Sequence, residues 1–410
     1  MSRTECDVVV IGAGPGGCAA SIELARAGHS VTLIDKAAFP RDKICGDGLT
    51  TSALRSLEYL GLSLGSLPTA RPIHNVVVRS PRGFEATFPL PEGPGLFGVV
   101  ATRLELDAAL VQVARDTGVV VREQCGIAEL HESPSHLTVG GSDGWSCSTQ
   151  HVVAADGMWS PTRKLVGANI AGYRGDWHAF RQYVTDVSER AQRELFISFD
   201  AAILPGYFWS FPLADGRANI GFGIQRGHKH SIQEMKLLWP QLLSLPYISE
   251  FLGPNYTPAA PHRAWPIPCQ VDSMTAHAAG VLFVGDAVAP CDVMTGEGIG
   301  QALETGLIAA RTISEQFGNR TAAGPLYQQR VRSEFTPDHQ LASLLVRALQ
   351  HRKGARAALR VAATNDWTRR NFARWLFEDY PRGIALEPQL WKRGALSGPG
   401  AFHSHGGDPR

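Results

Sequence analysis

The stretch Cys6–Gly17, CDVVVIGAGPGG, decides the fold, because an apolar run of strand-forming residues leads directly into a glycine-rich turn. Small residues continue at helical spacing through Ala27, and a second apolar run, Ser30–Ile34, ends at the acid Asp35. Strand, glycine turn, helix, strand and terminal acid within about 30 residues are typical of a dinucleotide-binding βαβ unit. We therefore predict a buried parallel sheet in this part of the chain.

The three glycines of the motif have separate tasks. Gly12 permits the sharp turn out of the strand, Gly14 lets the backbone approach a pyrophosphate, and Gly17 allows the helix to pack close to the sheet. The pyrophosphate would lie at the positive N-terminus of that helix, and Asp35 would accept hydrogen bonds from ribose hydroxyls. Glycines also form ordinary tight turns, so the prediction depends on the strand, helix and acid around them.

A second signal lies near the other end of the chain. Gly285-Asp286-Ala287 follows the buried run Gly280–Val284 and precedes Gly296-Glu297-Gly298, which opens a helix to Phe317. Asp286 is placed to hold a ribityl hydroxyl, and N–H groups at the helix start are placed to stabilise the N1–O2 edge of a flavin. A solvated turn is the alternative for this segment alone. Together with the first motif, it favours FAD.

These segments resemble the FAD-binding fingerprints of the flavoprotein superfamily that includes p-hydroxybenzoate hydroxylase, flavin-dependent halogenases and geranylgeranyl reductases, over most of residues 5–310. Ala155-Asp156-Gly157, with Ser160 and Arg163, is similar to the DG turn of that superfamily. Arg103 is similar to the arginine of its flavin-contacting helix, although a surface residue at a helix start fits the sequence equally well. The expected cofactor-binding residues are Gly12, Gly14, Pro15, Gly17, Asp35, Lys36, Lys43, Cys45, Gly46, Arg103, Asp156, Gly157, Gly285, Asp286, Pro290, Gly296, Gly298 and Ile299.

Two further segments resemble the geranylgeranyl reductase branch. Residues 43–48, KICGDG, are similar to its KxCGxG loop, and residues 205–212, PGYFWSFP, to its aromatic YxWxFP strand, with the leading proline one residue closer to the tyrosine. Aromatic rings on one face of a strand suit an apolar chain, although such a stripe is also typical of sheet core. The resemblance implies substrate binding by Tyr207, Trp209, Phe211 and Gly221, and catalytic roles for Cys45, Tyr207 and Trp209.

Cys45 is the cysteine that the motifs single out. Lys43 lies two residues away and would favour its thiolate, so that Cys45 would donate a proton or gate the re face of the flavin. A thiol packed behind a glycine turn is the alternative. Halogenases need a lysine between flavin and substrate and a tryptophan-rich motif that ends in Ile-Pro, whereas Lys43 and the ending Phe211-Pro212 do not follow that pattern.

The resemblance implies a reductase in which reduced FAD delivers hydride to a carbon–carbon double bond of a polyprenyl chain and a proton follows on the neighbouring carbon. The carrier would be a diphosphate, a quinone such as menaquinone, or a glycerol ether lipid. Two alternatives stay open: an FAD-dependent monooxygenase of a natural-product pathway, and a non-catalytic prenyl-binding protein related to Rab GDP dissociation inhibitors. We expect NAD(P)H or ferredoxin as the electron donor, but the sequence does not identify which, since a second complete GxGxxG unit is lacking.

Composition excludes several other classes. The 410 residues carry a net charge of +1 and are 44% hydrophobic, which argues against nucleic acid or an acidic polymer as partner. No apolar run reaches about 18 residues, and the N-terminus lacks a signal-peptide cleavage site, so we expect a cytoplasmic protein, with peripheral membrane contact for a lipid substrate. The seven cysteines form no CxxC pair and no HExxH is present, so neither disulfides nor a metal are expected. The oligomeric state is not indicated.

The pattern predicts an α/β (α+β) protein with a Rossmann-like FAD-binding domain, a mostly antiparallel substrate-binding sheet and C-terminal helices. For the segment Asn371–Leu376, with Phe377, the sequence is compatible with an interfacial membrane anchor or with a helix packed on the rest of the protein. The expected divisions are 1–60, 98–180 and 272–322 for the FAD-binding domain, 61–97 and 181–271 for the substrate-binding domain, 323–396 for the helical region and 397–410 for a flexible tail.

Overall fold

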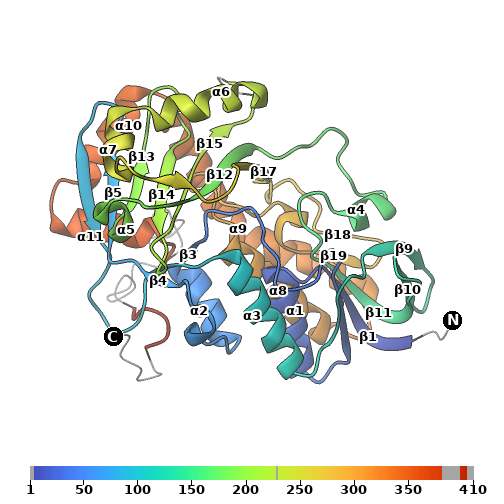
Figure 1. The fold of residues 1–410 in the computed structure, drawn as a ribbon. Coiled ribbons are helices and arrows are strands. Elements are labelled where there is room, and N and C mark those ends of the chain that lie inside the picture. Colours follow the sequence, from blue (N-terminus) through green and yellow to red (C-terminus); the bar gives the residue numbers. More distant parts are fainter. Residues whose placement is uncertain (1–3, 228–229, 381–397, 404–410) are drawn as a thin grey trace.

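The computed structural model describes residues 4–227, 230–380 and 398–403. Two eight-stranded sheets and a small three-stranded sheet organise this part of the chain (Figure 1). The first large sheet is mostly parallel and the second mostly antiparallel, with further helices from the C-terminal part. The predicted fold class is confirmed.

The first sheet is built around β1, which pairs in parallel with β2 on one side and β11 on the other. Val8, Val9 and Val10 in β1 have no exposed surface, as expected for a parallel strand covered on both faces. Its order is β18 (His277–Ala278), β19 (Val281–Phe283), β11 (Ser146–Ala154), β1 (Thr4–Ile11), β2 (Val31–Ile34) and β8 (Val120–Arg122), with the hairpin β9 (Ile127–Glu132) and β10 (Leu137–Gly141) attached to β11.

Helices α1 (Pro15–Arg26) and α8 (Ile299–Glu315) pack tightly together on this sheet. Glycine permits the close approach, because a Cβ at Gly306 would lie 2.2 Å from the carbonyl oxygen of Gly16. The sheet also packs against α3 (Arg103–Asp116), while α4 (Pro161–Leu165) follows β11. Two distant parts of the sequence therefore form one layer above the first sheet.

The second sheet forms a roof over the carboxyl edge of the first (Figure 1). Its order is β16 (Thr257–Pro258), β12 (Trp177–Thr185), β15 (Ala218–Gln225), β14 (Phe208–Pro212), β13 (Leu195–Ser198), β5 (Asn75–Arg79) and β6 (Glu85–Pro89), with β17 (Arg263–Ile267) also paired to β12. The helices α5 (Glu189–Arg193), α6 (Ile232–Leu243) and α7 (Pro246–Leu252) cover its outer face, where Phe222 stacks on Trp239 and Phe196 on Phe251.

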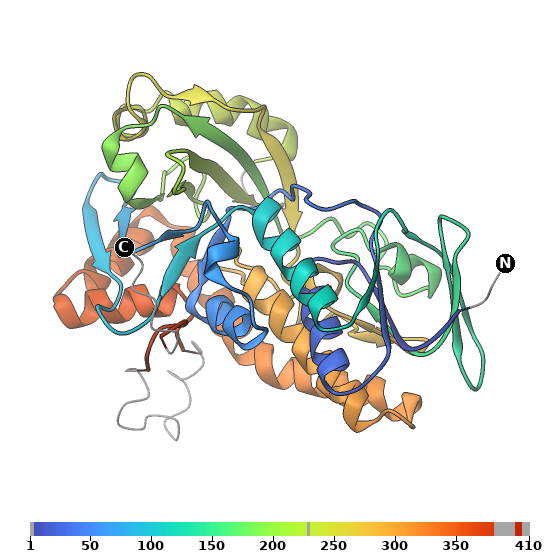
Figure 2. The ribbon, with the colours of Figure 1, turned by 60° about the horizontal axis from the view of Figure 1, so that its bottom comes forward.

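The C-terminal helices pack beside the β5–β6 hairpin (Figure 2). They are α9 (Arg320–Leu349), α10 (Arg352–Ala362) and α11 (Asp366–Leu376). Between them and the first sheet lie α2 (Thr51–Tyr59) and the small sheet of β3 (Gly48–Thr50), β7 (Gly98–Val100) and β4 (Arg71–Pro72). No helix of the described residues is long and apolar enough to cross a bilayer.

Several predicted elements are confirmed, including the strands β1, β2 and β19, the helices α1 and α8, and the aromatic strand β14. The sequence pattern did not predict the hairpin of β9 and β10 or the helices α6 and α7, and it did not single out β12. The division into domains remains a prediction. Residues 381–396 of the predicted helical region, and most of the predicted tail, lie outside the described residues.

Candidate active site

A cavity of about 790 Å³ lies between the first sheet and the roof sheet. The residues that follow β1, β2, β11 and β19 line it, among them Gly12, Asp35, Asp156 and Gly285. The carboxyl ends of parallel strands meet at one edge of a sheet, which is where ligands bind in open α/β folds. The first sheet therefore brings the three sequence motifs into one site.

The glycine turn shapes the end of the cavity at α1. Gly12 has a φ of +102°, and a Cβ there would lie 2.4 Å from the carbonyl oxygen of Ala155. A Cβ at Gly17 would lie 1.8 Å from the carbonyl oxygen of Gly12, so Gly17 serves helix packing and does not line the cavity. Within the described chain no side chain caps the N-terminus of α1. This positive helix end fits a pyrophosphate.

Asp35 holds the glycine turn in place. Its Oδ2 accepts a hydrogen bond from the backbone N–H of Ala13 at 2.7 Å, and its Oδ1 accepts one from Ala37 at 2.8 Å. The carboxylate is buried and also lines the cavity. Both oxygens thus have backbone partners already, and binding of ribose hydroxyls by Asp35 remains a prediction.

The predicted DG turn lies beside the glycine turn, because a Cβ at Gly12 would lie 3.0 Å from the backbone nitrogen of Asp156. Asp156 accepts from the backbone N–H of Thr162 through Oδ2 at 2.9 Å, while its Oδ1 is buried without a hydrogen-bond partner in the described part of the chain. Burial raises the pKa of Asp156. Arg163 donates to the carbonyl oxygens of Ala168, Thr275 and Ala287, and these hydrogen bonds stabilise the position of the DG turn. The unpaired carboxyl oxygen fits a ligand hydroxyl.

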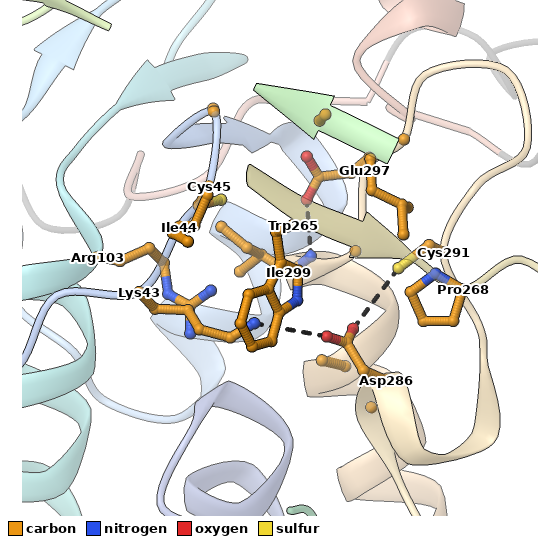
Figure 3. A pocket seen from close by; sticks show the side chains of 18 of the residues that line it. Lys43, Ile44, Cys45, Arg103, Trp265, Pro268, Asp286, Cys291, Glu297 and Ile299 are labelled. Carbon is orange, nitrogen blue, oxygen red and sulfur yellow. Dashed lines mark hydrogen bonds and ion pairs between the residues drawn. The ribbon is translucent and has the colours of Figure 1, made fainter. Parts of the chain in front are cut away.

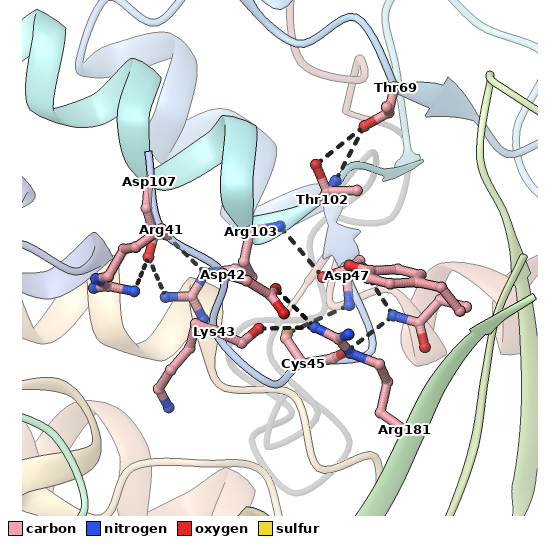
Figure 4. Close-up of polar contacts among 12 residues, drawn as sticks. Arg41, Asp42, Lys43, Cys45, Asp47, Thr69, Thr102, Arg103, Asp107 and Arg181 are labelled. Atoms are coloured by element: carbon pink, nitrogen blue, oxygen red, sulfur yellow. Dashed lines mark hydrogen bonds and ion pairs between the residues drawn. The ribbon is translucent and has the colours of Figure 1, made fainter. Parts of the chain in front are cut away.

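Arg103 is buried, and the alternative of a surface residue is wrong. Its Nε and Nη2 donate to the two carboxylate oxygens of Asp107 at 2.7 and 2.8 Å, and the same carboxylate pairs with Arg41 at 2.9 Å (Figure 4). A bidentate pair of this kind fixes the plane of the guanidinium group. Arg103 therefore enters the cavity lining as a cation in a fixed orientation.

Lys43 lies between a carboxylate and an aromatic ring. Its Nζ is 3.7 Å from Asp286 Oδ2 and 4.1 Å from the ring centroid of Trp265, and all three residues line the cavity (Figure 3). Burial lowers the pKa of Lys43, and the nearby Asp286 carboxylate opposes that shift. The sequence singled out Lys43 and Asp286 but missed Trp265, which lies on the irregularly patterned strand β17.

The loop around Cys45 is held from the roof sheet by a buried polar network. The Asp47 carboxylate accepts from the hydroxyl of Tyr183 at 2.5 Å and from Nδ2 of Asn219 at 2.8 Å. Arg181 donates to the carbonyl oxygens of Lys43 and Cys45 and pairs with the carboxylate of Asp42 (Figure 4). Burial raises the pKa of Asp47 to about 6.

This network could not be predicted from the sequence, because its members lie far apart in the chain and come into contact only when the loop packs against the roof sheet. Asp47 has a φ of +66°, so the loop adopts a left-handed conformation at a residue other than glycine. Its backbone N–H donates to Sγ of Cys45 at 3.3 Å.

Cys45 carries a protonated thiol. Burial raises its pKa to about 11, and the Asp47 carboxylate adds to the rise. The expectation that Lys43 favours the thiolate is therefore wrong, since the ammonium group is directed to Asp286 and Trp265 instead. A neutral thiol on the cavity wall is able to donate a proton but is a weak nucleophile.

Glu297 is a second titratable group that the sequence did not single out for chemistry. It precedes α8, and its Oε1 accepts from the backbone N–H groups of Ile299 and Gly300 at 2.9 and 3.4 Å (Figure 3). Burial raises its pKa to about 7 although these N–H groups favour the carboxylate. The carboxyl group thus lies in the cavity at the start of the helix.

The aromatic strand faces the cavity as predicted from alternation. Tyr207, Trp209 and Phe211 all line it, with Tyr207 donating its hydroxyl to the carbonyl oxygen of Thr295. Gly221 does not line the cavity, because it lies directly under Trp209: a Cβ there would be 2.2 Å from Cζ2 of the indole. Its predicted contact with substrate is therefore corrected to a packing role.

Most of the other predicted cofactor residues line the cavity, and one does not. Pro290 forms a β-bridge with Cys269 and lines a smaller neighbouring cavity, because the turn after Gly285 directs it away. The cofactor-side residues in the cavity wall are Gly14, Pro15, Lys36, Lys43, Cys45, Gly46, Gly157, Asp286, Gly296, Gly298 and Ile299.

An apolar arm of the cavity continues beyond Cys45 and the aromatic strand. Its walls are the underside of the roof sheet and the three C-terminal helices. Trp375 and Phe377 belong to this wall, so the second interpretation of α11, a helix packed on the body, agrees with the structure. The lining residues are Val78, Leu195, Ile197, Phe199, Leu345, Ala348, Leu349, Ala355, Ala358, Leu359, Phe372, Trp375, Leu376 and Phe377.

Comparison with known proteins identifies similar sequences across most of the chain. The family described as FAD binding domain matches residues 5–318. The menaquinone reductase of Mycobacterium tuberculosis is 34% identical over 329 residues, covering 76% of this chain and 77% of that protein. Digeranylgeranylglycerophospholipid reductase 2 of Methanopyrus kandleri is 31% identical, covering 81% of this chain and 83% of that protein.

Solved structures with the same fold are more distant in sequence. A geranylgeranyl bacteriochlorophyll reductase-like protein from Thermoplasma acidophilum has a TM-score of 0.79 at 19% identity, covering 95% of this chain and all of that one. A probable FAD-dependent monooxygenase from Pseudomonas aeruginosa has a TM-score of 0.70 at 18% identity, covering 87% of this chain and all of that one. At these identities the likeness shows the fold alone.

Proposed function

The chain belongs to the FAD binding domain family, and on that premise we propose that it reduces carbon–carbon double bonds in the polyprenyl chain of a lipid. FAD is the cofactor, and the uncapped start of α1, the unpaired oxygen of Asp156 and the glycine turn fit it. The observation that carries the proposal is the apolar arm, which begins beside Cys45 and the aromatic strand and continues along the C-terminal helices. Curated relatives named menaquinone and digeranylgeranylglycerophospholipid reductases support it.

The chain positions an alkene and supplies a proton. Bound FAD, once reduced, supplies the hydride. An isolated double bond is a poor hydride acceptor, so the site must hold it closely and protonate the adjacent carbon. Tyr207, Trp209 and Phe211 offer the flat apolar surface that positions it.

We assign the proton to the thiol of Cys45. The thiol is protonated at neutral pH, and the N–H of Asp47 at 3.3 Å is placed to stabilise the thiolate that remains after transfer. Arg181 and Asn219 of the roof sheet both donate to the carbonyl oxygen of Cys45, which fixes the backbone that carries the thiol on the cavity wall. Cys45→Ser should keep reduced activity because a hydroxyl still donates, whereas Cys45→Ala should lose the protonation step.

The apolar arm favours a neutral carrier. None of its lining residues is charged, so a diphosphate head drawn into the arm would lose its water with no cation inside to pair with it. The charged lining residues belong to the flavin end of the cavity, where Arg103 and Lys43 have carboxylate partners. We therefore place a prenylated quinone of the menaquinone type in the arm.

The reductant and the cellular location complete the proposal. We propose that NAD(P)H or a ferredoxin reduces the flavin by transient docking, since the βαβ motif at Gly12 is committed to FAD. A lipid substrate requires contact with a membrane surface, so the protein would act as a peripheral enzyme at the cytoplasmic face.

An anaerobic incubation tests the reaction. Purified yellow protein, reduced with dithionite, is mixed with menaquinone or with geranylgeranyl diphosphate, and the product masses are compared. The product is reoxidised in air before mass analysis, so that any quinol formed by dithionite returns to the quinone. A remaining gain of about two mass units per reduced bond, one hydride and one proton, on menaquinone is the expected result. The same gain on the diphosphate alone would contradict the neutral carrier. No gain on either, with substrate-dependent oxygen uptake on aeration, would favour the monooxygenase alternative.

A further inference from the structure

We propose that the end of α9, α10 and the start of α11 form a surface that docks on an anionic lipid bilayer and admits the lipid to the cavity directly from the membrane. This surface, the docking face, consists of the exposed and partly exposed side chains of residues 344–370. The inference rests on the proposed function, because it takes the substrate to be a membrane lipid.

The apolar arm opens on the docking face. Ala348 in α9 and Ala358 in α10 both line the cavity and are exposed to solvent. Behind them Leu345, Leu349 and Leu359 line the arm and are less exposed or buried. A prenyl chain entering between α9 and α10 would therefore meet apolar side chains from the surface inward.

Large exposed apolar side chains lie one helical turn from the residues at this opening: Leu344 precedes Ala348 on α9, and Val361 follows Ala358 on α10. Leu344, Val361 and Trp367 are 62%, 68% and 65% exposed, each on a different one of the three helices. Single exposed apolar residues are ordinary on soluble proteins, but three on neighbouring helices that line an apolar cavity favour an apolar partner. Tryptophan in particular is favoured at the boundary between lipid headgroups and acyl chains.

The charge of the docking face is strongly one-sided. Residues 344–370 contain seven arginines and lysines and a single acid, Asp366, whereas the whole chain has a net charge of only +1. The remainder of the chain therefore carries a net charge of −5. The docking face is thus strongly basic although the whole chain is nearly neutral. An anionic bilayer attracts such a segment, and the attraction is screened by salt.

The helix α10 shows the arrangement most clearly. Its sequence, RKGARAALRVA, has four cations and no acid. Arg352, Arg356 and Arg360 follow one another at i, i+4 and i+8, beside the buried stripe that contains Ala355 and Leu359. None of these arginines forms an ion pair with another described residue. Unpaired cations next to exposed apolar side chains are typical of helices that lie in a membrane interface.

A charge-reversal experiment on the holoenzyme tests the docking face. The variant Arg352→Glu/Arg356→Glu/Arg360→Glu is compared with Lys164→Glu/Arg174→Glu/Arg332→Glu, which makes the same change in net charge at exposed cations outside the docking face. Lys164 lies on α4, which follows β11 in the chain and is far from α10 (Figure 1). Flavin absorbance confirms that both variants fold.

Co-sedimentation with vesicles of phosphatidylglycerol and phosphatidylcholine in equal parts gives the readout. We expect the first variant to bind on the order of 100-fold more weakly than the wild type, and the control to bind like the wild type. Trp367→Ser should weaken binding to these vesicles about tenfold without the strong salt dependence of the arginines.

Two outcomes would overturn the docking face: absence of vesicle binding by the wild type, or equal binding by the two triple variants. A separate assay uses a short-chain prenyl quinone dispersed in detergent, which requires no bilayer. There the docking-face variant should turn over as fast as the wild type, and a parallel loss in detergent would contradict a role limited to docking. Wild type that binds vesicles but reduces no quinone would refute the proposed function and leave the docking face standing.

Discussion

The side-chain amide of Asn219 donates to the Asp47 carboxylate at 2.8 Å and to the carbonyl oxygen of Cys45 at 2.9 Å. Its own oxygen accepts from Nε1 of Trp209 at 3.2 Å. One residue of the roof sheet thus ties the loop that bears the thiol to the strand that bears the aromatic rings. This buried amide links the two groups directly.

Replacement of this amide should damage both stability and turnover. Asn219→Ala leaves three buried polar groups short of a partner, and each such loss costs about 1–3 kcal/mol in general, so we expect a loss of at least that size. Urea unfolding followed by flavin fluorescence measures the stability, and steady-state kinetics measure kcat and KM. Asn75→Ala, at an exposed position on β5, is the control. Equal stability and kcat in the two variants would contradict the role assigned to Asn219.

The glycine turn offers a test with a matched control. Gly12→Ala should abolish stoichiometric FAD binding, because the new Cβ would lie 2.4 Å from the carbonyl oxygen of Ala155. Gly28 also has a positive φ, +91°, but a Cβ there would meet nothing within 4 Å. Gly28→Ala should therefore cost only the backbone strain of about 1–2 kcal/mol and retain the flavin. The ratio of absorbance at flavin and protein wavelengths distinguishes the two variants. Retention of flavin by Gly12→Ala would be evidence that the turn at Gly12 does not bind the cofactor.

The cysteines should differ in their reactivity toward iodoacetamide. A hydrogen bond with Cys147, whose Sγ is 3.4 Å away, lowers the pKa of Cys6 to about 7, whereas burial raises that of Cys45 to about 11. Only the thiolate reacts, so at pH 8 Cys6 should be alkylated well before Cys45. Peptide mass spectrometry of the folded protein after increasing times gives the order. Cys45 labelled first would contradict a protonated thiol, and equal labelling in urea serves as the control.

Stability should respond to pH through Glu304. Burial, together with the carboxylates of Glu334 and Asp338, raises its pKa to about 7. The folded state then binds more protons than the unfolded state between the ordinary glutamate pKa and about 7, so stability falls as pH rises through that window. Glu304→Gln removes this loss and should be more stable than the wild type at pH 8 by about 1–2 kcal/mol, after allowance for partial exposure.

Urea unfolding at pH 5 and pH 8 checks this prediction. The difference between Glu304→Gln and the wild type should be near zero at the lower pH and largest at the higher one. Glu92→Gln, at an exposed position, is the control. A difference that does not change with pH would show that Glu304 titrates normally.

The local sequence pattern was sufficient to predict a residue's role where that role depends on the backbone conformation alone. Gly12 and Gly17 could be assigned from sequence because a sharp turn and a close helix contact exclude every side chain, wherever the motif lies in the fold. The alternation that placed Tyr207, Trp209 and Phe211 on one face is likewise a property of the strand itself.

Side-chain contacts between distant segments could not be derived in this way. The thiol of Cys45 was expected to be ionised because Lys43 is its neighbour in sequence, but the ammonium group turns to Asp286 and Trp265, and the roof sheet buries the thiol. Gly221 was expected to contact substrate, and only the pairing of β14 with β15 shows that Trp209 covers it.

The sequence by itself determined the parallel sheet, the glycine cradle and the aromatic strand, because short-range sterics and periodicity set all three. The tertiary structure alone decided which charges are neutralised, which thiol is buried and where the apolar arm opens. These features depend on desolvation and on contacts such as that between Asn219 and Cys45, 174 residues apart, and both exist only once the two sheets and the C-terminal helices have come together.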